Sequence, residues 1–400
     1  MKIKKKKLLW FLLVMPFFYP NSIAGTLVAT IWHQWRMLAT FMSIIYIFQN
    51  IKIIRNLEKV TWLIIIFYIM QILATGINKL DIAFDCKTAI MMSCFVIVIS
   101  LIVYKEGNEG ILFFYQISHV LIWLNFLSVI LFYRNGLVRD SYDTAVYFWS
   151  TKNHIISLTV AYLMISFYLF YEGYIAKKKY WIGIIVSIIA VFFMGSSTAI
   201  AALVVYGSFI FCCKICGKNQ RVVNMKMAVV IGSLVDIAIV VFRIQERLGG
   251  IISTLFGKDT TLTGRTGLWD QALELMRINP WFGKGNSYAL NQYGWLTMHF
   301  WNSRTQTLDD VYFVSHNQFL EIMVNGGLIC LIPFIGIFYW MIRSAQRIEN
   351  SKYKMTIGAA LIAYFIAMIT DLITPYESVY LFIIVASYIH KCENVDVGGI

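Results

Sequence analysis

The sequence predicts an all-α fold: a polytopic transmembrane helix bundle of about twelve spans, with both termini inside and one large extracytoplasmic loop. Three observations predict this architecture. The 400 residues are 59% hydrophobic and 14% charged, whereas soluble domains contain about a quarter charged residues. The mean hydropathy is correspondingly high, at +0.69. Long apolar runs recur along the chain, and the lysines and arginines cluster in alternate gaps between these runs.

The apolar runs give the expected spans, because about 17–25 such residues cross a bilayer as a helix. We place the spans at 8–28, 36–51, 60–76, 88–104, 111–132, 154–171, 180–195, 197–213, 226–242, 318–342, 355–373 and 376–390. The seventh and eighth spans form one run of double length, which only Gly195-Ser196-Ser197-Thr198 interrupts. We therefore expect a tight turn at these residues.

The basic residues orient the bundle, because the cytoplasmic loops of membrane proteins are enriched in lysine and arginine. Alternate loops, starting inside, hold Lys52, Arg55 and Lys59; Lys105; Lys177, Lys178 and Lys179; Lys214, Lys218, Arg221 and Lys226; and Arg343, Arg347, Lys352 and Lys354. The short outside loops hold fewer basic residues. This alternation places both termini inside. It also explains the formal net charge of +13 without a nucleic-acid partner.

The chain then divides into spans 1–9 at 1–242, a large extracytoplasmic loop at 243–315, and spans 10–12 with a cytoplasmic tail at 316–400. Apolar residues at spacings of three and four predict an amphipathic helix over 266–278 in this loop. Those residues are Leu268, Trp269, Ala272, Leu273 and Met276. We expect Thr263 or Thr266 to cap the helix and Asn279-Pro280 to end it. Its apolar face rests either on the membrane surface or on the mouth of the bundle.

Three arginines in the loop are candidate anion ligands. Arg265 precedes the amphipathic helix, where a guanidinium fork and unpaired backbone N–H groups together suit a diphosphate. The alternative is an ordinary loop arginine, paired with Asp259 or Asp270. Arg243 and Arg247 lie four residues apart just beyond the ninth span. They suit a lipid phosphate at the membrane boundary, or else they snorkel to lipid headgroups.

His316 is the candidate base, because it opens the tenth span and a neutral imidazole accepts a proton from a hydroxyl group. Asn317 follows it, and Glu321 enters the apolar run one helical turn later. Intramembrane carboxylates are usually functional, so Glu321 either orients the His316 imidazole or faces the same cavity. Alone, a histidine at a helix start is more often a neighbour of the N-cap. The other histidines have no comparable surroundings: His33, His119, His154, His299 and His390.

We expect neither a metal nor a cofactor. The sequence has no nucleotide-binding Gly-rich loop followed by Lys-Ser/Thr, no His-Glu-x-x-His and no Gly-x-Ser-x-Gly. Asp309-Asp310 resembles a metal-binding acid pair, but without further acids it reads as a solvated loop or a helix cap.

A fixed order of motifs runs through the loop into the tenth span. These motifs are Gly264-Arg265, Trp269, Asn279-Pro280-Trp281-Phe282-Gly283-Lys284-Gly285 and His316-Asn317-Gln318-Phe319-Leu320. The order resembles the O-antigen ligase and Wzy-type polysaccharide polymerase superfamily of bacterial envelopes. In that family a large extracytoplasmic loop near the C-terminus carries Gly-Arg, Trp and Asn-Pro-x-x-Gly-x-Gly, and His-Asn-x-x-Leu opens the next span.

The resemblance implies a metal-independent, inverting glycosyltransferase of the bacterial cytoplasmic (inner) membrane, with no cofactor and an active site that faces outward. It implies undecaprenyl-diphosphate-linked glycan as donor and acceptor, and membrane lipids, a flippase and a chain-length regulator as further partners. In the family the loop arginine engages the diphosphate, and the histidine serves the acceptor hydroxyl or the diphosphate. These catalytic roles fall on Arg265 and His316. We expect the substrate to be bound by Arg243, Arg247, Asn317, Glu321 and Trp269.

The chain departs from the family pattern at one place. Family members often carry Ser-Arg followed by small residues in an earlier span, and here the similar place reads Gly195-Ser196-Ser197-Thr198-Ala199. One diphosphate contact is therefore unassigned. Our hypothesis is that Arg243 or Arg247 supplies it.

Three functions stay open at this stage. The first is a polymerase that joins lipid-linked repeat units into capsule, exopolysaccharide or O-antigen. The second is a ligase that moves finished glycan to another acceptor, which the motifs do not separate from a polymerase. The third, from another class, is a flippase or transporter of lipid-linked glycan. A transporter is expected to bury charges in its central spans, and the candidates Asp236 and Asp371 both lie near span ends.

Overall fold

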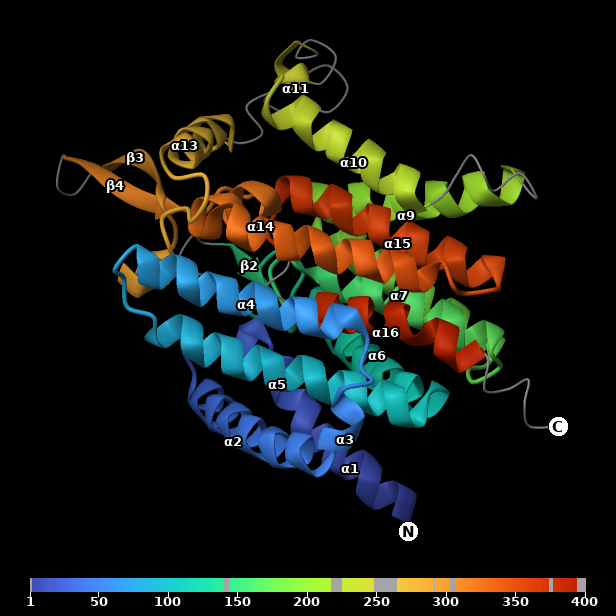
Figure 1. The fold of residues 1–400 in the computed structure, drawn as a ribbon. Helices are drawn as coiled ribbons and strands as arrows, with labels where there is room; N and C mark the ends of the chain where they lie inside the picture. Colours follow the sequence, from blue (N-terminus) through green and yellow to red (C-terminus); the bar gives the residue numbers. More distant parts are fainter. Residues whose placement is uncertain are drawn as a thin grey trace.

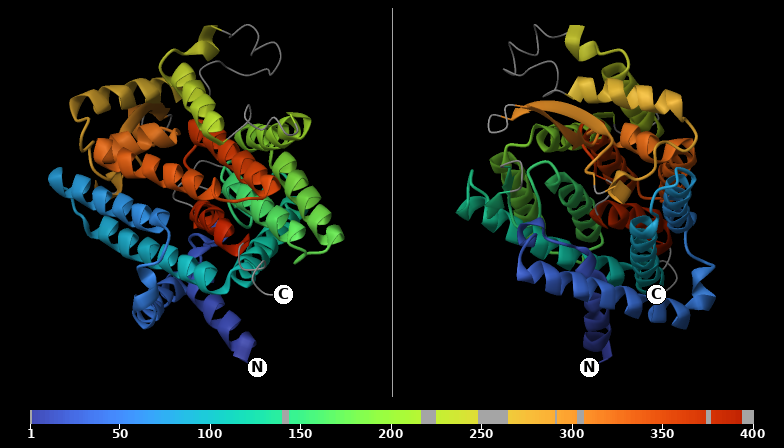
Figure 2. Two further views of the ribbon diagram at one scale, coloured as in Figure 1. Left: turned by 45° about the vertical axis from the view of Figure 1, so that its right-hand side comes forward. Right: turned by 90° about the vertical axis from the view of Figure 1, so that its left-hand side faces the viewer.

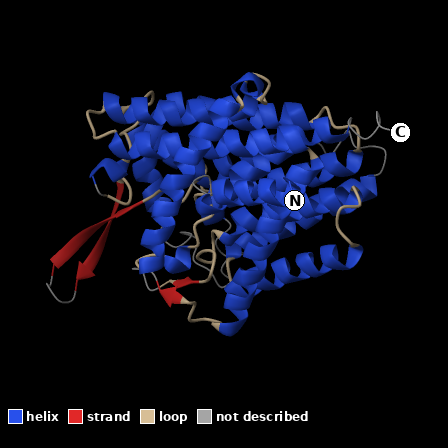
Figure 3. Ribbon diagram, turned by 90° about the horizontal axis from the view of Figure 1, so that it is seen from below, coloured by secondary structure: helices blue, strands red, loops and turns tan. Residues whose placement is uncertain are grey.

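The computed structural model describes residues 2–139, 144–216, 225–247, 265–290, 292–302, 307–373 and 377–393. Most of these residues lie in helices, which pack side by side into a bundle (Figure 1). The strands form two two-stranded sheets, and the longer hairpin projects from the helices (Figure 3). The all-α prediction is confirmed.

The helices of the first half are α1 (Lys2–Val14), α2 (Leu27–Gln49), α3 (Ile51–Ile54), α4 (Lys59–Ile77), α5 (Ala83–Glu106), α6 (Asn108–Leu131) and α7 (Ile155–Tyr171). Short 3₁₀ turns η1 (Met15–Phe17) and η2 (Asn21–Ile23) follow α1, because Pro16 and Pro20 interrupt the apolar run there. Strands β1 (Val138–Arg139) and β2 (Ala145–Val146) precede α7.

The second half holds α8 (Lys177–Met194), α9 (Ser197–Cys216), α10 (Met225–Val240), α11 (Ile244–Arg247), α13 (Arg265–Ile278), η3 (Ser287–Leu290), α14 (Gln318–Ala345), α15 (Ser351–Thr370) and α16 (Glu377–Glu393). Strands β3 (Leu296–Asn302) and β4 (Thr307–Phe313) lie between η3 and α14 and pair antiparallel. Each expected span from the second onward overlaps a long helix. The expected first span, 8–28, is not continuous: α1 ends at Val14, and η1 and η2 precede α2. The expected turn is present too: Gly195 ends α8 with a left-handed φ of 66°, and α9 begins at Ser197.

Among the described residues, six helices are long and apolar enough to cross a membrane by length and composition: α4, α5, α6, α9, α14 and α15. Large apolar side chains on the outer helices, such as Phe41 and Leu234, are more than half exposed. Patches of this kind are unfavourable in water and favourable against lipid. The chain is therefore a multi-pass membrane protein. The number of spans and the side on which each loop lies stay predictions.

The C-terminal helices form the centre of the bundle. Figure 2 shows α14, α15 and α16 between α4 and α5 on one side and α7 and α9 on the other. Nearly every residue of α7 and α16 is buried. Helices that are apolar all round belong in such interior positions.

The helix α14 is broken at Gly327, whose φ of 61° and ψ of −162° are not helical. A break leaves backbone groups without intrahelical partners. The segment 279–285 supplies them: Lys284 N donates to Val324 O at 2.7 Å, and Gly285 N donates to Asn325 O at 2.9 Å. In return, Leu328 N donates to Pro280 O at 2.9 Å. The Asn-Pro-Trp-Phe-Gly-Lys-Gly motif, residues 279–285, thus holds the two parts of the broken helix together. We call this segment the clasp.

The same motif is anchored to α4 and α5 at its other end. Asn286 N donates to Thr75 Oγ1 at 3.1 Å, and the Asn286 amide donates to the buried carboxylate of Asp85. The loop chain is therefore fixed both to the first half of the bundle and to the N-terminal part of α14.

The clasp requires glycine at Gly283 and Gly327, and this gives a first prediction. A Cβ at Gly283 would lie 2.4 Å from Val324 O, and one at Gly327 would lie 2.4 Å from the Trp281 carbonyl carbon. Both residues have positive φ. We expect Gly283→Ala and Gly327→Ala each to lower the free energy of unfolding by more than about 2 kcal/mol.

The measurement is the midpoint of thermal unfolding of the purified protein in detergent. Gly207→Ala is the matched control, because Gly207 lies within α9 and a Cβ there would meet nothing within 4 Å. That change is expected to be neutral or slightly stabilising. Equal midpoints for all three variants would contradict the clasp.

Candidate active site

A buried carboxylate gathers the candidate catalytic groups at one end of the bundle. Asp371 directly follows α15, and its side chain is 4% exposed. His316 Nδ1 lies 3.7 Å from Asp371 Oδ1, and His154 Nε2 lies 3.6 Å from the same oxygen. The guanidinium of Arg265, the first residue of α13, donates to the neighbouring carbonyl of Thr370. One carboxylate thus stands between two imidazoles, with a guanidinium beside it.

We call the meeting point of Asp371, His316, His154 and Arg265 the Asp371 junction. The charges at this junction favour an ionised Asp371. Burial by itself would raise the pKa of Asp371, but the nearby imidazoles of His154 and His316 outweigh it and hold the pKa well below its ordinary value. A depressed carboxyl pKa means that the charge is present at neutral pH and is lost only below the ordinary carboxyl range. Burial lowers the pKa of Arg265, and Asp371 opposes this shift. An arginine so placed keeps its charge at neutral pH.

His316 has an unusual backbone conformation for a residue with a side chain, with a φ of 52°. Its neighbours hold it there. Ser315 N donates to Glu321 Oε2 at 2.7 Å, and Ser315 Oγ donates to the Asn317 carbonyl at 2.8 Å. A non-glycine residue with this backbone conformation carries a strain of about 1–3 kcal/mol, and such residues are concentrated at active sites. The 28% exposed imidazole is therefore presented by a fully buried, over-determined turn.

Asn317 is the structural anchor of this turn. It caps α14, because its Oδ1 accepts from Phe319 N and Leu320 N, both at 3.0 Å. Its amide Nδ2 donates to Asp236 Oδ1 at 2.7 Å, which ties α14 to α10. The side chain is fully buried. Asn317 positions the start of α14 and offers no surface to a ligand.

Glu321 also supports the turn. It accepts from Ser315 N and, at 2.8 Å, from the Asn325 side chain. The carboxylate beside the His316 ring is that of Asp371. Glu321 therefore acts on His316 through the backbone of Ser315, and Asp371 acts on it directly.

The amphipathic helix was predicted closely. Helix α13 covers residues 265–278, and its apolar residues Leu268, Trp269 and Ala272 are buried against Leu320 of α14. The helix rests on the bundle mouth, the second of the two expected places, beside β3 and β4 (Figure 1). The expected cap at Thr266 is wrong, because Thr266 lies inside α13, after Arg265. The expected cap at Thr263 lies outside the described residues.

Trp269 and Arg243 hold this helix in place. Trp269 is fully buried, and its Nε1 donates to the Ser315 carbonyl at 2.9 Å, next to His316. Arg243 pairs with Asp270 of α13 and donates to the Thr266 carbonyl at 3.2 Å. The partner of Asp270 is therefore Arg243, whereas the alternative expected from the sequence was Arg265. The side chain of Arg247 lies outside the described residues.

The turn between α8 and α9 borders the site. Thr198 Oγ1 lies 3.0 Å from Thr370 Oγ1, and Ser196 Oγ donates to Asn153 Oδ1 at 2.9 Å. Asn153 directly precedes His154, and Thr370 directly precedes Asp371. The place at which the sequence lacks an arginine is therefore part of the same junction.

Sequence reasoning missed two residues of the site, His154 and Asp371. The sequence predicts no role for His154, and it suggests Asp371 only as a possible transport residue. A signal was present, because the expected spans 154–171 and 355–373 put both residues at the outer end, where His316 also lies. Sequence reasoning also missed the β3–β4 hairpin, which occupies much of the loop between α13 and α14. Among the described residues, no group of three or more metal-ligating side chains is found.

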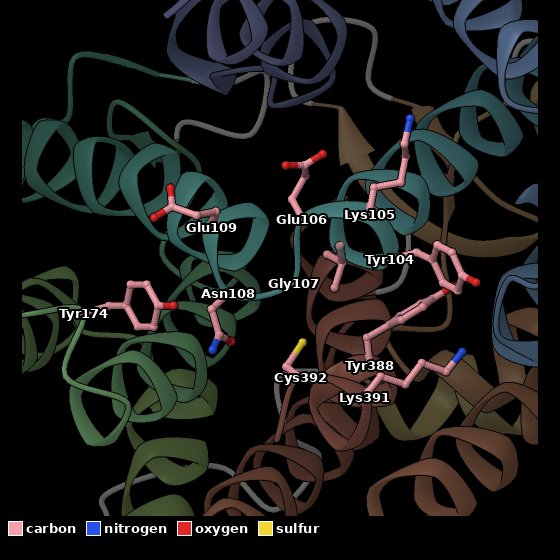
Figure 4. A pocket seen from close by; sticks show the side chains of 11 residues that line it. Tyr104, Lys105, Glu106, Gly107, Asn108, Glu109, Tyr174, Tyr388, Lys391 and Cys392 are labelled. Carbon is pink, nitrogen blue, oxygen red and sulfur yellow. The ribbon is translucent and has the colours of Figure 1, made fainter. Parts of the chain in front are cut away.

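A cavity of about 400 Å³ lies elsewhere, between the α5–α6 junction and the end of α16 (Figure 4). Its lining includes Glu106, Glu109 and Lys391, which pair with Lys6, Lys7 and Glu58 respectively. Asp371 precedes the first turn of α16, and the cavity adjoins its last turn. A helix of 17 residues separates these ends by about 25 Å. The cavity is therefore distinct from the Asp371 junction.

Comparison with known proteins confirms the resemblance that the motifs indicated. Residues 182–335 match the family model described as O-antigen ligase. A segment of 146 residues is 31% identical to a protein named exopolysaccharide production protein ExoQ from Rhizobium meliloti (strain 1021). That match covers 32% of this chain and 31% of the relative, so it spans about a third of the relative's length.

The strained turn at His316 gives a second prediction. Glycine adopts a positive φ without the cost of about 1 kcal/mol that other residues bear. We therefore expect His316→Gly to be more stable than His316→Ala by about 1 kcal/mol. The measurement is again the thermal unfolding midpoint. His33 is the control, because it lies within α2, and there the glycine variant is expected to be the less stable one. The same order at both positions would contradict the described turn.

Proposed function

We propose that this chain, whose residues 182–335 carry the O-antigen ligase family segment, is a membrane glycosyltransferase that polymerises undecaprenyl-diphosphate-linked oligosaccharide repeat units on the outer side of the bacterial cytoplasmic membrane. The observation that carries the proposal is the Asp371 junction, where a base and a guanidinium stand around one buried carboxylate. The family match and the printed name of the relative, which refers to exopolysaccharide production, support it.

In the proposed reaction a hydroxyl of the acceptor repeat unit attacks the anomeric carbon of the donor. The new glycosidic bond forms as the bond to the diphosphate breaks, so the anomeric configuration inverts. The hydroxyl proton passes to His316. Its Nδ1 faces Asp371, which leaves Nε2 as the base, and the carboxylate stabilises the imidazolium that forms.

Arg265 serves the leaving group. Undecaprenyl diphosphate departs with the bonding electrons and gains negative charge, which a preorganised guanidinium stabilises. The Thr370 carbonyl already orients this guanidinium, so little reorganisation is needed. Because the guanidinium provides the positive charge, the mechanism uses no metal.

The position of the buried acids supports this reaction over transport. Asp85, Glu321 and Glu377 each lie in the first turn of their helix. Asp371 lies just past the end of α15. A transport path is expected to place such charges at the middle of the spans. Among the described residues these acids lie at helix ends, as an external site requires.

The third prediction tests the two catalytic residues. In cells deleted of the gene, restoration with His316→Ala or Arg265→Ala is expected to leave single repeat units on the lipid, because transfer has lost its base or its cation. The loss of polymer should be at least about 100-fold, the usual size of such contributions. The measurement is the length distribution of lipid-linked and surface glycan.

Arg277→Ala is the matched control, because Arg277 is an exposed arginine near the end of the same helix, α13. Long chains made by both catalytic variants would refute the site. Accumulation of long lipid-linked chains would instead identify the ligase, which transfers finished glycan to another acceptor.

Arg243 and Arg247 are proposed to contact lipid phosphate at the mouth of the site. Arg243 has part of its guanidinium committed to Asp270 and Glu246. Replacement of both arginines by glutamine is expected to lower polymer output about tenfold, which corresponds to the loss of one charge-assisted hydrogen bond. Unchanged output in the double variant would remove both residues from the proposal.

A further inference from the structure

We infer that His154 is a positioning residue of the active site: it keeps the Asp371 carboxylate directed at the His316 base and away from Arg265. This inference rests on the proposed function. It assigns a role to a residue from α7, a helix outside the loop and the motifs that carry the other catalytic groups.

His154 is itself held in place by its neighbours. His154 precedes the first residue of α7, and its Nδ1 lies 3.1 Å from Thr151 Oγ1. The neighbouring Asn153 side chain accepts from Ser196 Oγ at 2.9 Å. The imidazole is therefore fixed at one nitrogen, and its other nitrogen, Nε2, is directed at Asp371 Oδ1, 3.6 Å away.

One carboxylate oxygen, Asp371 Oδ1, is contacted by several groups. Asp371 Oδ1 accepts from Leu372 N at 2.8 Å and also faces His154 Nε2 and His316 Nδ1. These three groups approach from the end of α15, the start of α7 and the start of α14. Together they determine where the carboxylate lies, and His316 is the one among them that the proposed reaction uses as its base.

Arg265 is an alternative partner for the Asp371 carboxylate. Arg265 is close enough for its charge to interact with Asp371, yet its guanidinium donates to the Thr370 carbonyl, and no ion pair joins the two side chains in the described structure. A direct ion pair between Arg265 and Asp371 would slow the reaction in two ways. It would neutralise the cation needed by the diphosphate, and it would remove the carboxylate from the His316 ring. His154 competes for Asp371 and so favours the separated arrangement.

The experiment measures initial polymerisation rates of the purified full-length protein. Its substrate is the lipid-linked repeat unit extracted from cells deleted of this gene. We expect His154→Ala to lower kcat about 30-fold and to change KM less than about threefold, because His154 touches Asp371 and not the substrate. His154→Gln retains a donor of similar reach and is expected to recover at least half of the lost rate.

A double-mutant cycle shows whether His154 acts through Asp371. In the Asp371→Asn background, His154→Ala is expected to cost less than about twofold more. Thr151→Val removes the support of His154 and is expected to lower kcat several-fold, which provides a second variant if His154→Ala folds poorly. His33→Ala is the matched control, since His33 is an exposed histidine in α2.

The inference alone would be overturned by a His154→Ala rate equal to wild type, or by a full multiplicative loss in the Asp371→Asn background. A rate that falls equally in His154→Ala and His154→Gln, with matching loss of folded protein, would also overturn it. The failure of the proposed function has a different signature. In that case wild type forms no polymer from this substrate, or His316→Ala forms as much as wild type.

Discussion

The active-site end of the structure depends on the buried charge of Asp371. A carboxylate that is 4% exposed at the side chain is stable only with charged or hydrogen-bonding partners, and here they come from different parts of the chain. His154 arrives from α7 and His316 from the turn before α14, while Arg265 lies on the adjacent carbonyl. The need to satisfy this one charge brings the ends of α7, α13, α14 and α15 together.

Other contacts of the loop fix the positions of these helix ends. The broken helix α14 borrows its missing backbone hydrogen bonds from the segment 279–285, which is itself fixed to α4 and α5. Helix α13 buries Trp269 beneath Ser315, next to the strained His316. The residues proposed to react with the substrate thus differ from the residues that hold them in place. His316 and Arg265 are the groups that the proposed reaction uses, whereas Asn317, Glu321 and Trp269 have their polar groups or their surface occupied within the protein.

The sequence predicted the helices and the amphipathic α13 well, because hydrophobic runs and a period of 3.6 are local properties. It also predicted Arg265 and His316 as catalytic residues from motif order, and the structure brings both close to Asp371. It did not identify Asp371 and His154 as site residues, because their meeting depends on how α15 packs beside α7 and not on any local spacing. The β3–β4 hairpin was missed although Leu296, Met298 and Phe300 alternate with polar residues. A two-stranded hairpin is at best marginally stable alone, so its formation depends on pairing and packing that local sequence does not show.

The most direct test is the initial rate of polymer formation by Asp371→Asn, an isosteric change that removes the charge and keeps the shape. We predict a loss of at least about 100-fold relative to wild type, measured on equal amounts of folded protein, because the base would lose its carboxylate partner. An Asp371→Asn protein that is folded and retains more than half of the wild-type rate would contradict the central role of this carboxylate.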